Sequence, residues 1–183
     1  MNSRTDQIRP LSLLIAIAAS LLLLVHPKAS ATESRDVTNL ASLFDLAADS
    51  KSPATDFELP NLDGTTVRLS KFKGQRPVLL YFWATWCQYC SSVRPAVMKL
   101  REKTGPGEME ILAIDVGGSD SLERVKRYQE GHPVSWPVLY DGEGKVARVY
   151  RVQGIPLFIL VNKEGNIVYR DTEPPSDVRK YLQ

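Results

Sequence analysis

The sequence predicts an α/β domain in which helices flank a central mixed β-sheet, with a β-hairpin ahead of it. Two continuous apolar runs, 77–83 and 109–116, are typical of strands buried on both faces. A segment with apolar residues at helical spacing follows each run. Strand and helix patterns thus alternate, as they do in α/β proteins. Right-handed crossovers would place the two apolar strands parallel and adjacent.

The first half of the domain supports this prediction element by element. Residues 57–59 and 67–69 alternate in polarity around Asp63-Gly64, which is a hairpin turn signal. The apolar run 77–83 predicts a buried strand. Residues 88–104 carry Val93, Val97 and Leu100 on one face, which predicts a helix.

The second half predicts further helices and strands. These are a strand over 109–116, a helix over 122–131 that Gly131 ends, a strand over 136–140, a helix over 146–152, and antiparallel strands over 156–161 and 166–170 joined at Glu164-Gly165. Ser176 is expected to cap a last helix that carries Val178 and Leu182.

The first 31 residues resemble an export signal. Arg4 and Arg9 give a positive start, residues 11–25 carry no charge, and the small triplet Ala29-Ser30-Ala31 suits signal peptidase. The apolar run is short for a membrane span, which needs about 20 residues. We expect cleavage after Ala31, with an uncleaved anchor as the alternative and a buried core helix as a third reading. No cysteine follows the run, so a lipoprotein anchor is excluded, and the expected location is periplasmic or otherwise extracytoplasmic.

Residues 32–52 predict either a linker or a short helix. Their apolar residues Val37, Leu40, Phe44 and Ala47 recur at helical spacing, but the segment is otherwise small and polar. The folded domain is expected to cover residues 53–183.

Charge excludes one class of partner. The chain of 183 residues holds 23 basic and 21 acidic side chains. Three of the basic residues and one acidic residue fall within the first 31, so the remainder is neutral. A neutral domain gives no electrostatic reason to bind nucleic acid, and we expect membrane association only through the N-terminal segment.

Cysteine usage is the most informative feature of the composition. The two cysteines, Cys87 and Cys90, stand three positions apart. A secreted disulfide scaffold would need more cysteines at wider spacing. A zinc site would need four ligands, and the only other soft candidates are His26 and His132. We therefore expect no metal and no cofactor.

The Cys-x-x-Cys motif lies where a buried strand passes into a helix. Residues i and i+3 share one helix face, near enough for a disulfide. A cysteine at the helix start meets free N–H groups and the positive end of the dipole, which favour a thiolate. We assign Cys87, expected to be exposed, as the nucleophile and Cys90, expected to be shielded, as the resolving thiol. An inert bridge is the alternative, but so short a loop stabilises little.

Several segments together resemble one family. The stretch 82–90 (FWATWCQYC) is similar to the active site of the thioredoxin superfamily, with Pro95 at the position of its helix proline and Gly154-Ile155-Pro156 at that of its cis-proline loop. Residues 56–64 and 67–70 resemble the start of the TlpA/ResA-like membrane-associated thiol–disulfide oxidoreductases. The resemblance covers about residues 53–183, and the strand and helix that this branch inserts would correspond to 109–135.

The resemblance implies a thioredoxin-like fold and a periplasmic thiol–disulfide oxidoreductase. That family commonly reduces protein disulfides, including the haem-attachment cysteines of apocytochrome c in cytochrome c biogenesis, and a membrane thiol protein resupplies its electrons. It also implies a cis bond before Pro156, which would turn the backbone of Ile155 towards Cys87. Trp86, Ile155 and Pro156 are the expected substrate-binding residues.

Two positions depart from the family pattern. Tyr81 stands where thioredoxins carry a buried aspartate, and Val93 where many TlpA/ResA-like reductases carry a glutamate. Either acid could manage the proton of Cys90. We therefore expect no carboxylate within hydrogen-bond reach of Cys90, with proton transfer through water or the Tyr81 hydroxyl. Asp115, at the end of the second apolar strand, is the one acid that its placement could bring near.

The same residues leave three other functions to consider: a disulfide-introducing oxidant, a peroxiredoxin and a non-enzymatic metal adaptor. A disulfide-introducing oxidant would share the motif; Ile155 before Pro156 and the lack of a histidine between the cysteines resemble the reducing branch. A peroxiredoxin needs a threonine three positions before its reactive cysteine, where Ala84 stands. A non-enzymatic adaptor could present Cys87 and Cys90 to a metal, which a thiol titration with copper(I) or zinc would reveal.

Overall fold

The computed structural model describes residues 52–181. The expected leader over 1–31 and nearly all of the expected linker or helix over 32–52 lie outside the described residues. Among residues 52–181, no helix is long and apolar enough to cross a membrane.

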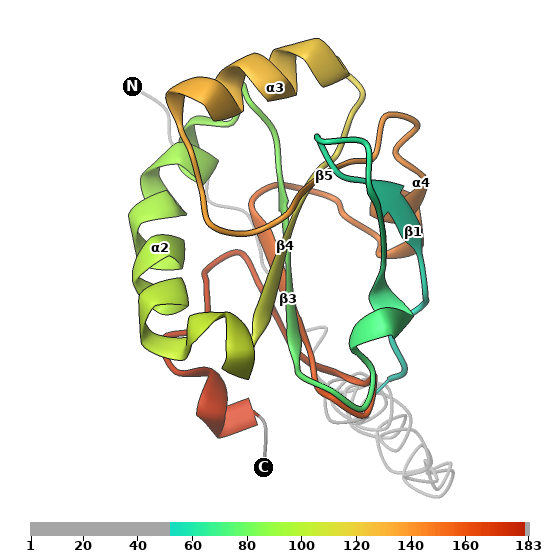
Figure 1. The fold of residues 1–183 in the computed structure, drawn as a ribbon, viewed down its shortest axis with the longest axis vertical. Coiled ribbons are helices and arrows are strands. Elements are labelled where there is room, and N and C mark those ends of the chain that lie inside the picture. Colours follow the sequence, from blue (N-terminus) through green and yellow to red (C-terminus); the bar gives the residue numbers. More distant parts are fainter. Residues whose placement is uncertain (1–51, 182–183) are drawn as a thin grey trace, which may run out of the picture. The chain divides into compact units, whose positions relative to one another are not determined.

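A five-stranded mixed sheet forms the centre of this domain (Figure 1). Its spatial order is β5-β4-β3-β6-β7, with bounds β3 Val78–Trp83, β4 Glu110–Asp115, β5 Val138–Tyr140, β6 Leu157–Val161 and β7 Ile167–Asp171. Strands β3, β4 and β5 run parallel, whereas β6 is antiparallel to both β3 and β7. The predicted mixed sheet and the parallel pairing of the two apolar strands are both confirmed.

The apolar runs form strands because both faces of the sheet are covered. Every residue of β3 is buried. Since side chains alternate along a strand, Leu79, Tyr81 and Trp83 face one layer and Leu80 and Phe82 the other. A polar side chain on either face of this strand would need a partner in the core.

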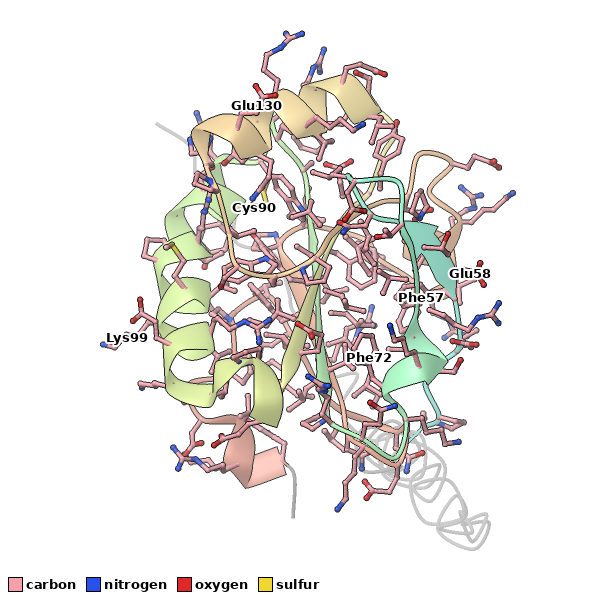
Figure 2. All side chains as sticks on the ribbon, viewed as in Figure 1. Phe57, Glu58, Phe72, Cys90, Lys99 and Glu130 are labelled. Atoms are coloured by element: carbon pink, nitrogen blue, oxygen red, sulfur yellow. A yellow bond between two sulfur atoms is a disulfide. The ribbon has the colours of Figure 1, made fainter. Side chains whose placement is uncertain are left out.

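Helices and a hairpin cover the two faces separately. One face packs against α2 (Gln88–Glu108), α3 (Leu122–Gly131) and the 3₁₀ turn η2 (Val178–Tyr181). The other packs against the hairpin β1 (Glu58–Pro60) and β2 (Thr66–Arg68), the 3₁₀ turn η1 (Leu69–Phe72), and α4 (Lys145–Val149). Figure 2 shows Cys90 on the α2 side and Phe57 and Phe72 on the hairpin side. The predicted hairpin is confirmed.

Helix α2 runs beyond its predicted end at residue 104. Gly105 breaks the helical backbone with φ 65°, a left-handed value that favours glycine, and one more turn follows it to Glu108. Pro95 lies inside the helix. The strand and helix that the resemblance placed within 109–135 are β4 and α3.

Three further predicted elements differ by two or more residues or in kind. Strand β5 begins at Val138 instead of residue 136, and α4 ends at Val149 instead of residue 152. The last element is a single 3₁₀ turn, so the prediction of a last helix capped by Ser176 is wrong. The carboxylate of Asp177 instead accepts a bond from the Arg179 amide at 3.1 Å, which satisfies the turn locally.

Candidate active site

The two cysteines lie at the start of α2, just after the carboxyl end of β3. Cys87 is the N-cap residue with extended backbone, and Cys90 belongs to the first turn. Their sulfurs form a disulfide of 2.07 Å across a Cα–Cα distance of 5.2 Å. The Cys87 sulfur also accepts the backbone N–H of Cys90 at 3.1 Å. The spacing i, i+3 thus places both sulfurs together, as the sequence predicts.

The burial of the cysteines differs from expectation at one position. Cys90 is 2% exposed, as predicted, but Cys87 is only 6% exposed, so the prediction of an exposed Cys87 is wrong for the disulfide form. Its neighbours take the exposed positions: Trp86 is 55% and Tyr89 49% exposed. The reason is geometric, since the N-cap side chain folds back over the first turn towards Cys90.

The loop before β6 lies against Cys87. The pairing of β6 with β3 sets Leu157 opposite Phe82, which carries the preceding residues to the end of the sheet where the cysteines lie. The peptide bond between Ile155 and Pro156 is cis. The Cys87 sulfur lies 3.8 Å from the carbonyl oxygen of Ile155. The structure therefore brings the predicted Ile155 next to the predicted Cys87.

Trp86, the residue before Cys87, and Ile155 line an open groove that neither cysteine lines. The groove measures about 410 Å³, and its other walls include Val152, Gln153 and Gly154 from the loop before β6. Pro156 is buried and does not line it. Of the three predicted substrate-binding residues, the groove thus joins Trp86 and Ile155, while Pro156 lies behind them.

The surroundings of Cys90 contain no acid at the two family positions. Val93 is buried in the core, and the Tyr81 hydroxyl donates to the carbonyl oxygen of Cys90 at 3.1 Å instead of contacting its sulfur. Burial raises the pKa of Tyr81 far above its ordinary value, so this hydroxyl stays protonated. Among residues 52–181, no carboxylate forms a hydrogen bond with the Cys90 sulfur, and the Asp115 side chain accepts its hydrogen bond from the Gly117 N–H.

A small cavity adjoins Cys90 on the side away from the groove. It measures about 20 Å³ and is lined by Tyr81, Trp83, Tyr128 and Trp136 among others. This volume is enough for about one water molecule. The buried Nε1 of Trp83 has no hydrogen-bond partner within the described part of the chain. The cavity therefore has room for the water that a proton route to Cys90 would need, although its walls are mainly apolar.

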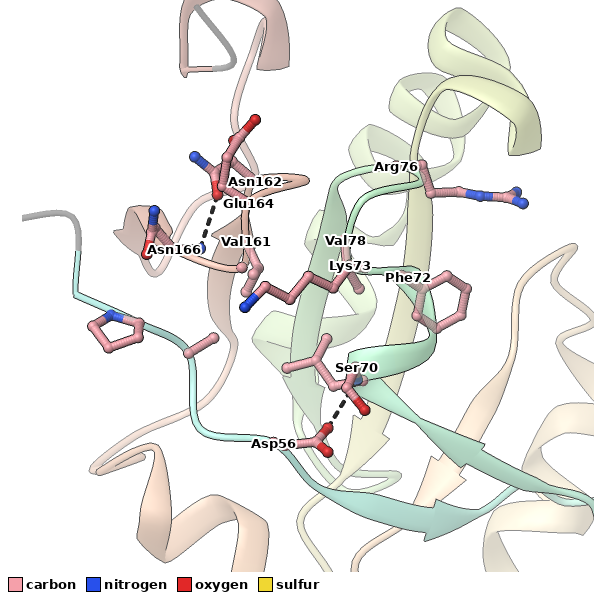
Figure 3. A pocket seen from close by; sticks show the side chains of 14 residues that line it. Asp56, Ser70, Phe72, Lys73, Arg76, Val78, Val161, Asn162, Glu164 and Asn166 are labelled. Atoms are coloured by element: carbon pink, nitrogen blue, oxygen red, sulfur yellow. Dashed lines mark hydrogen bonds between the residues drawn. The ribbon is translucent and has the colours of Figure 1, made fainter.

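A further pocket does not involve the predicted site residues. A pocket of about 170 Å³ lies near the starting end of β3, lined among others by Asp56, Ser70 and Asn166 (Figure 3). It is at the opposite end of β3 from the cysteines. Within residues 52–181, no group of three or more histidine, cysteine, aspartate or glutamate side chains could hold a metal ion. His132 lies at the end of α3, stacked on Tyr128.

Two contacts of the active-site segment were not predicted from the sequence. The Tyr89 hydroxyl, between the cysteines, hydrogen-bonds Glu173 in the segment after β7. The Asp120 carboxylate accepts two bonds from Thr85, two residues before Cys87. Both join segments more than 30 residues apart, and no local spacing signals them. The only sequence cue was the position of Asp120 directly before the helix cap Ser121.

Fold and site together define the class of this protein. A disulfide that can open to a dithiol lies at a helix start, faces a cis-proline loop, and directly follows Trp86, which lines a groove that an extended chain could enter. Thiol–disulfide exchange needs an accessible thiolate and a second thiol within reach of it. The chain is therefore a thioredoxin-like thiol–disulfide oxidoreductase.

Comparison with known proteins agrees with this class. The model of the AhpC/TSA family matches residues 51–170, and the chain belongs to this family. The thiol-disulfide oxidoreductase ResA of Bacillus thuringiensis subsp. konkukian (strain 97-27) is 31% identical over 132 residues, covering 71% of this chain and 75% of that relative. The predicted resemblance to ResA-like oxidoreductases is thereby confirmed.

Solved structures give the same result for the fold. A thiol:disulfide interchange protein DsbE from Chlorobium tepidum superposes with a TM-score of 0.62 at 27% identity, over 70% of this chain and 89% of that one. The exposed lipoprotein thioredoxin Etrx1 from Streptococcus pneumoniae strain TIGR4 gives 0.59 at 32% identity, over 66% and 91% of the two chains. The predicted thioredoxin-like fold is confirmed.

Proposed function

We propose that this oxidoreductase works as a reductase of protein disulfides outside the cytoplasm. The observation that carries the direction is that a backbone N–H and the helix start stabilise the Cys87 thiolate without any help from a basic side chain among the described residues. A strong oxidant is one whose reduced form is stabilised. Within residues 52–181, the Cys87 sulfur accepts the Cys90 N–H, and no basic side chain hydrogen-bonds it. Gln88 and Tyr89, between the cysteines, carry no positive charge.

The proposed reaction has two exchange steps. The Cys87 thiolate attacks one sulfur of the client disulfide, forming a mixed disulfide and releasing the other client sulfur as a thiolate. Cys90 then loses its proton and attacks the Cys87 sulfur, which closes the Cys87–Cys90 disulfide and releases the second client thiol. Two electrons pass from this chain to the client. A dithiol protein must then reduce the disulfide again, and we propose a membrane thiol protein as that donor.

The client segment is proposed to bind as an extended chain along the groove. Trp86 offers an apolar surface at one side, and the backbone carbonyl of Ile155 lies next to the Cys87 sulfur. Main-chain groups that face an extended peptide give affinity without demanding a particular sequence. Pro156 would support Ile155 from behind. This arrangement suits several protein clients, of which the family resemblance implies the haem-attachment cysteines of apocytochrome c.

Location is proposed from the N-terminal segment. The charged start, the apolar run 11–25 and Ala29-Ser30-Ala31 favour export, with an uncleaved anchor as the alternative. One structural neighbour, the pneumococcal protein, is described as an exposed lipoprotein. Intact-mass measurement on the exported protein should find a chain that starts at Thr32. A full-length chain held in the membrane fraction would indicate the anchor.

Two assays on the same protein test directly whether it reduces or introduces disulfides. The reduced chain should reduce the disulfides of insulin, with dithiothreitol as electron source, and the Cys87→Ser variant should not. The oxidised chain should oxidise a reduced, unfolded protein poorly under the same conditions. Efficient oxidation with little reduction would instead indicate the disulfide-introducing oxidant. Tight binding of copper(I) or zinc by the reduced chain without either activity would indicate the metal-handling adaptor.

A further inference from the structure

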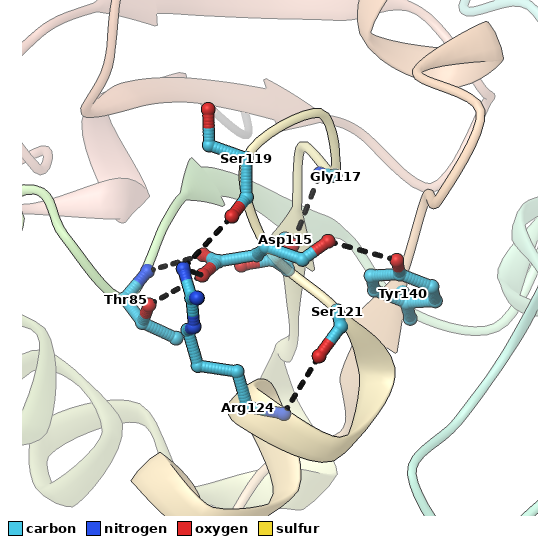
Figure 4. Close-up of polar contacts among 8 residues, drawn as sticks. Thr85, Asp115, Gly117, Ser119, Ser121, Arg124 and Tyr140 are labelled. Atoms are coloured by element: carbon cyan, nitrogen blue, oxygen red, sulfur yellow. Dashed lines mark hydrogen bonds and ion pairs between the residues drawn. The ribbon is translucent and has the colours of Figure 1, made fainter.

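Two buried carboxyl groups lie beneath the loop that carries Cys87. Asp115 ends β4 and is fully buried, and Asp120, in the loop before α3, is 5% exposed. Figure 4 shows Asp115, Thr85 and Tyr140 drawn together with Arg124 at this end of the sheet. Buried carboxyl groups are costly unless they are paired or hydrogen-bonded. The exchange steps described above use neither of them.

Asp120 holds the active-site loop directly. Its Oδ2 accepts the backbone N–H of Thr85 at 2.8 Å, and its Oδ1 accepts the Thr85 hydroxyl at 2.5 Å. Thr85 lies between the end of β3 and Cys87. Within the described residues, these are the only side-chain hydrogen bonds that tie residues 84–86 to another element. Bonds to a carboxylate are about twice as strong as neutral ones.

Asp115 supports Asp120 from below. Its Oδ1 accepts the Gly117 N–H at 3.0 Å, while its buried Oδ2 has no donor among residues 52–181. The Asp120 carboxyl lies close enough for the two side chains to share a hydrogen bond once one of them carries a proton. Burial, with the nearby charges of Asp120 and Asp141, raises the pKa of Asp115 to about 8, so Asp115 carries that proton at neutral pH.

Other polar groups around the pair come from α3, from β5 and from the loops after β5 and β3. The Arg124 guanidinium of α3 lies 3.6 Å from the Asp120 carboxylate and is itself largely exposed. The Tyr140 hydroxyl of β5 donates to the backbone carbonyl of Asp120 at 3.0 Å. The buried Asp141, in the loop after β5, accepts the Ala147 N–H. Thr85, in the loop between β3 and α2, donates the two hydrogen bonds to the Asp120 carboxylate. With a proton on Asp115, the Asp120 carboxylate faces the exposed guanidinium of Arg124.

We propose that Asp120 is a positioning residue for thiol–disulfide exchange, and that protonated Asp115 holds Asp120 against Thr85. The loop between β3 and α2 sets where Trp86 and the Cys87 sulfur stand relative to Ile155. A displacement of about 1 Å can cost two orders of magnitude in rate when reacting atoms must align. This inference rests on Cys87 as the attacking thiol of the proposed function.

The protonation state of Asp115 then determines how firmly the loop between β3 and α2 is held. Loss of its proton leaves two adjacent negative charges in a buried site, and Arg124 is the one cation of the described residues that forms an ion pair there. Repulsion between them weakens the hold of Asp120 on Thr85. The loop is therefore fixed while Asp115 is protonated and loosened once it ionises.

The kinetic test compares matched variants of the reduced chain reacting with a small aromatic disulfide by stopped flow at pH 7. Thr85→Val removes the hydroxyl donor at nearly equal size, and Thr85→Ser restores it. We expect Thr85→Val and Asp120→Asn to lower the rate constant by about 10- to 100-fold, and Thr85→Ser to stay within about threefold of wild type. Glu130→Gln, an exposed change on α3, is the control. If Asp120→Asn does not fold, the threonine pair carries the test.

The second readout is a titration that a merely structural role would not produce. Nuclear magnetic resonance should show the Thr85 amide proton shifting with a midpoint near pH 8, together with the carboxyl carbon of Asp115. In Asp115→Asn the Thr85 step should disappear. Equal rates for Thr85→Val and Thr85→Ser, or a Thr85 amide that does not titrate between pH 6 and 9.5, would overturn the proposal. A wild-type chain that exchanges no disulfide would instead overturn the proposed function.

Discussion

The backbone N–H of Cys90 points at the sulfur of Cys87 across 3.1 Å. An N–H group in this position stabilises negative charge on the sulfur, and the start of α2 adds its positive dipole end. No comparable donor reaches the Cys90 sulfur among the described residues. In the reduced chain, Cys87 should therefore form a thiolate more readily than Cys90. The Cys-x-x-Cys spacing alone would not decide which of the two does so.

Alkylation tests this inequality. When the reduced chain meets limiting iodoacetamide at pH 6.5, Cys87 should be labelled at least about 10 times faster than Cys90, because the thiolate is the reacting species. Peptide mass spectrometry on samples quenched at short times gives the two rates. Faster labelling of Cys90 would contradict the assignment.

Trapping tests the division of labour between the two cysteines. The Cys90→Ser variant should accumulate mixed disulfides between Cys87 and client proteins, since the thiol that releases them is missing. Cys87→Ser should trap few. Non-reducing gels of cells that express each variant give the comparison. Equal trapping by both variants would refute the roles proposed here.

Because Trp86 lines the groove, we predict that it contributes to the binding of protein substrates. Trp86→Ala should raise KM for a protein disulfide several-fold, with a smaller effect on a small disulfide that does not occupy the groove. Truncation of a central aromatic contact commonly costs more than about 1 kcal/mol in binding. Met98→Ala removes another exposed apolar side chain, on the outer face of α2, and serves as the control. Equal KM values for the two variants would exclude Trp86 from client binding.

Burial of Asp115 predicts a pH-dependent stability with a definite sign. The pKa of Asp115 is about 8 in the folded chain, against an ordinary value of 3.8. Between these values the folded state binds the extra proton, so its contribution is fully present below about pH 4 and is lost as pH rises through 8. The slope from this group is at most about 1.4 kcal/mol per pH unit.

The Asp115→Asn variant isolates that contribution. It should become progressively more stable than wild type from pH 5 to pH 8, with little further change above pH 9. Guanidinium denaturation of the oxidised proteins at each pH measures the difference, and Glu102→Gln, at an exposed acid on α2, controls for general charge effects. A constant difference between Asp115→Asn and wild type across this range would show that Asp115 is ionised throughout.

The parts of the fold that were predicted correctly depend on local patterns. The run 77–83 is apolar throughout because β3 is covered on both faces. The strand could therefore be predicted without knowing which elements cover it. The Cys-x-x-Cys spacing likewise suffices to place the two sulfurs within disulfide distance at a helix start. The loop of Ile155 was placed near Cys87 from the family resemblance, and the pairing of β6 with β3 gives the physical reason.

The parts that were missed depend on tertiary placement. The bonds from Thr85 to Asp120 span 35 positions, and their existence follows from the parallel pairing of β3 and β4 and the course of the loop before α3. Cys87 is buried because its side chain turns back over α2, which the residue's position in the sequence does not reveal. Residues 178–181 form a 3₁₀ turn because the Asp177 side chain closes it locally.

The reduction potential of the Cys87–Cys90 pair tests the central claim most directly. Equilibration with defined glutathione or dithiothreitol redox buffers at pH 7, read by mass spectrometry of trapped thiols, gives this value. A protein-disulfide reductase should lie below about −200 mV, towards the value of about −270 mV typical of thioredoxin. A potential near −120 mV, where the strong oxidant DsbA lies, would contradict the account.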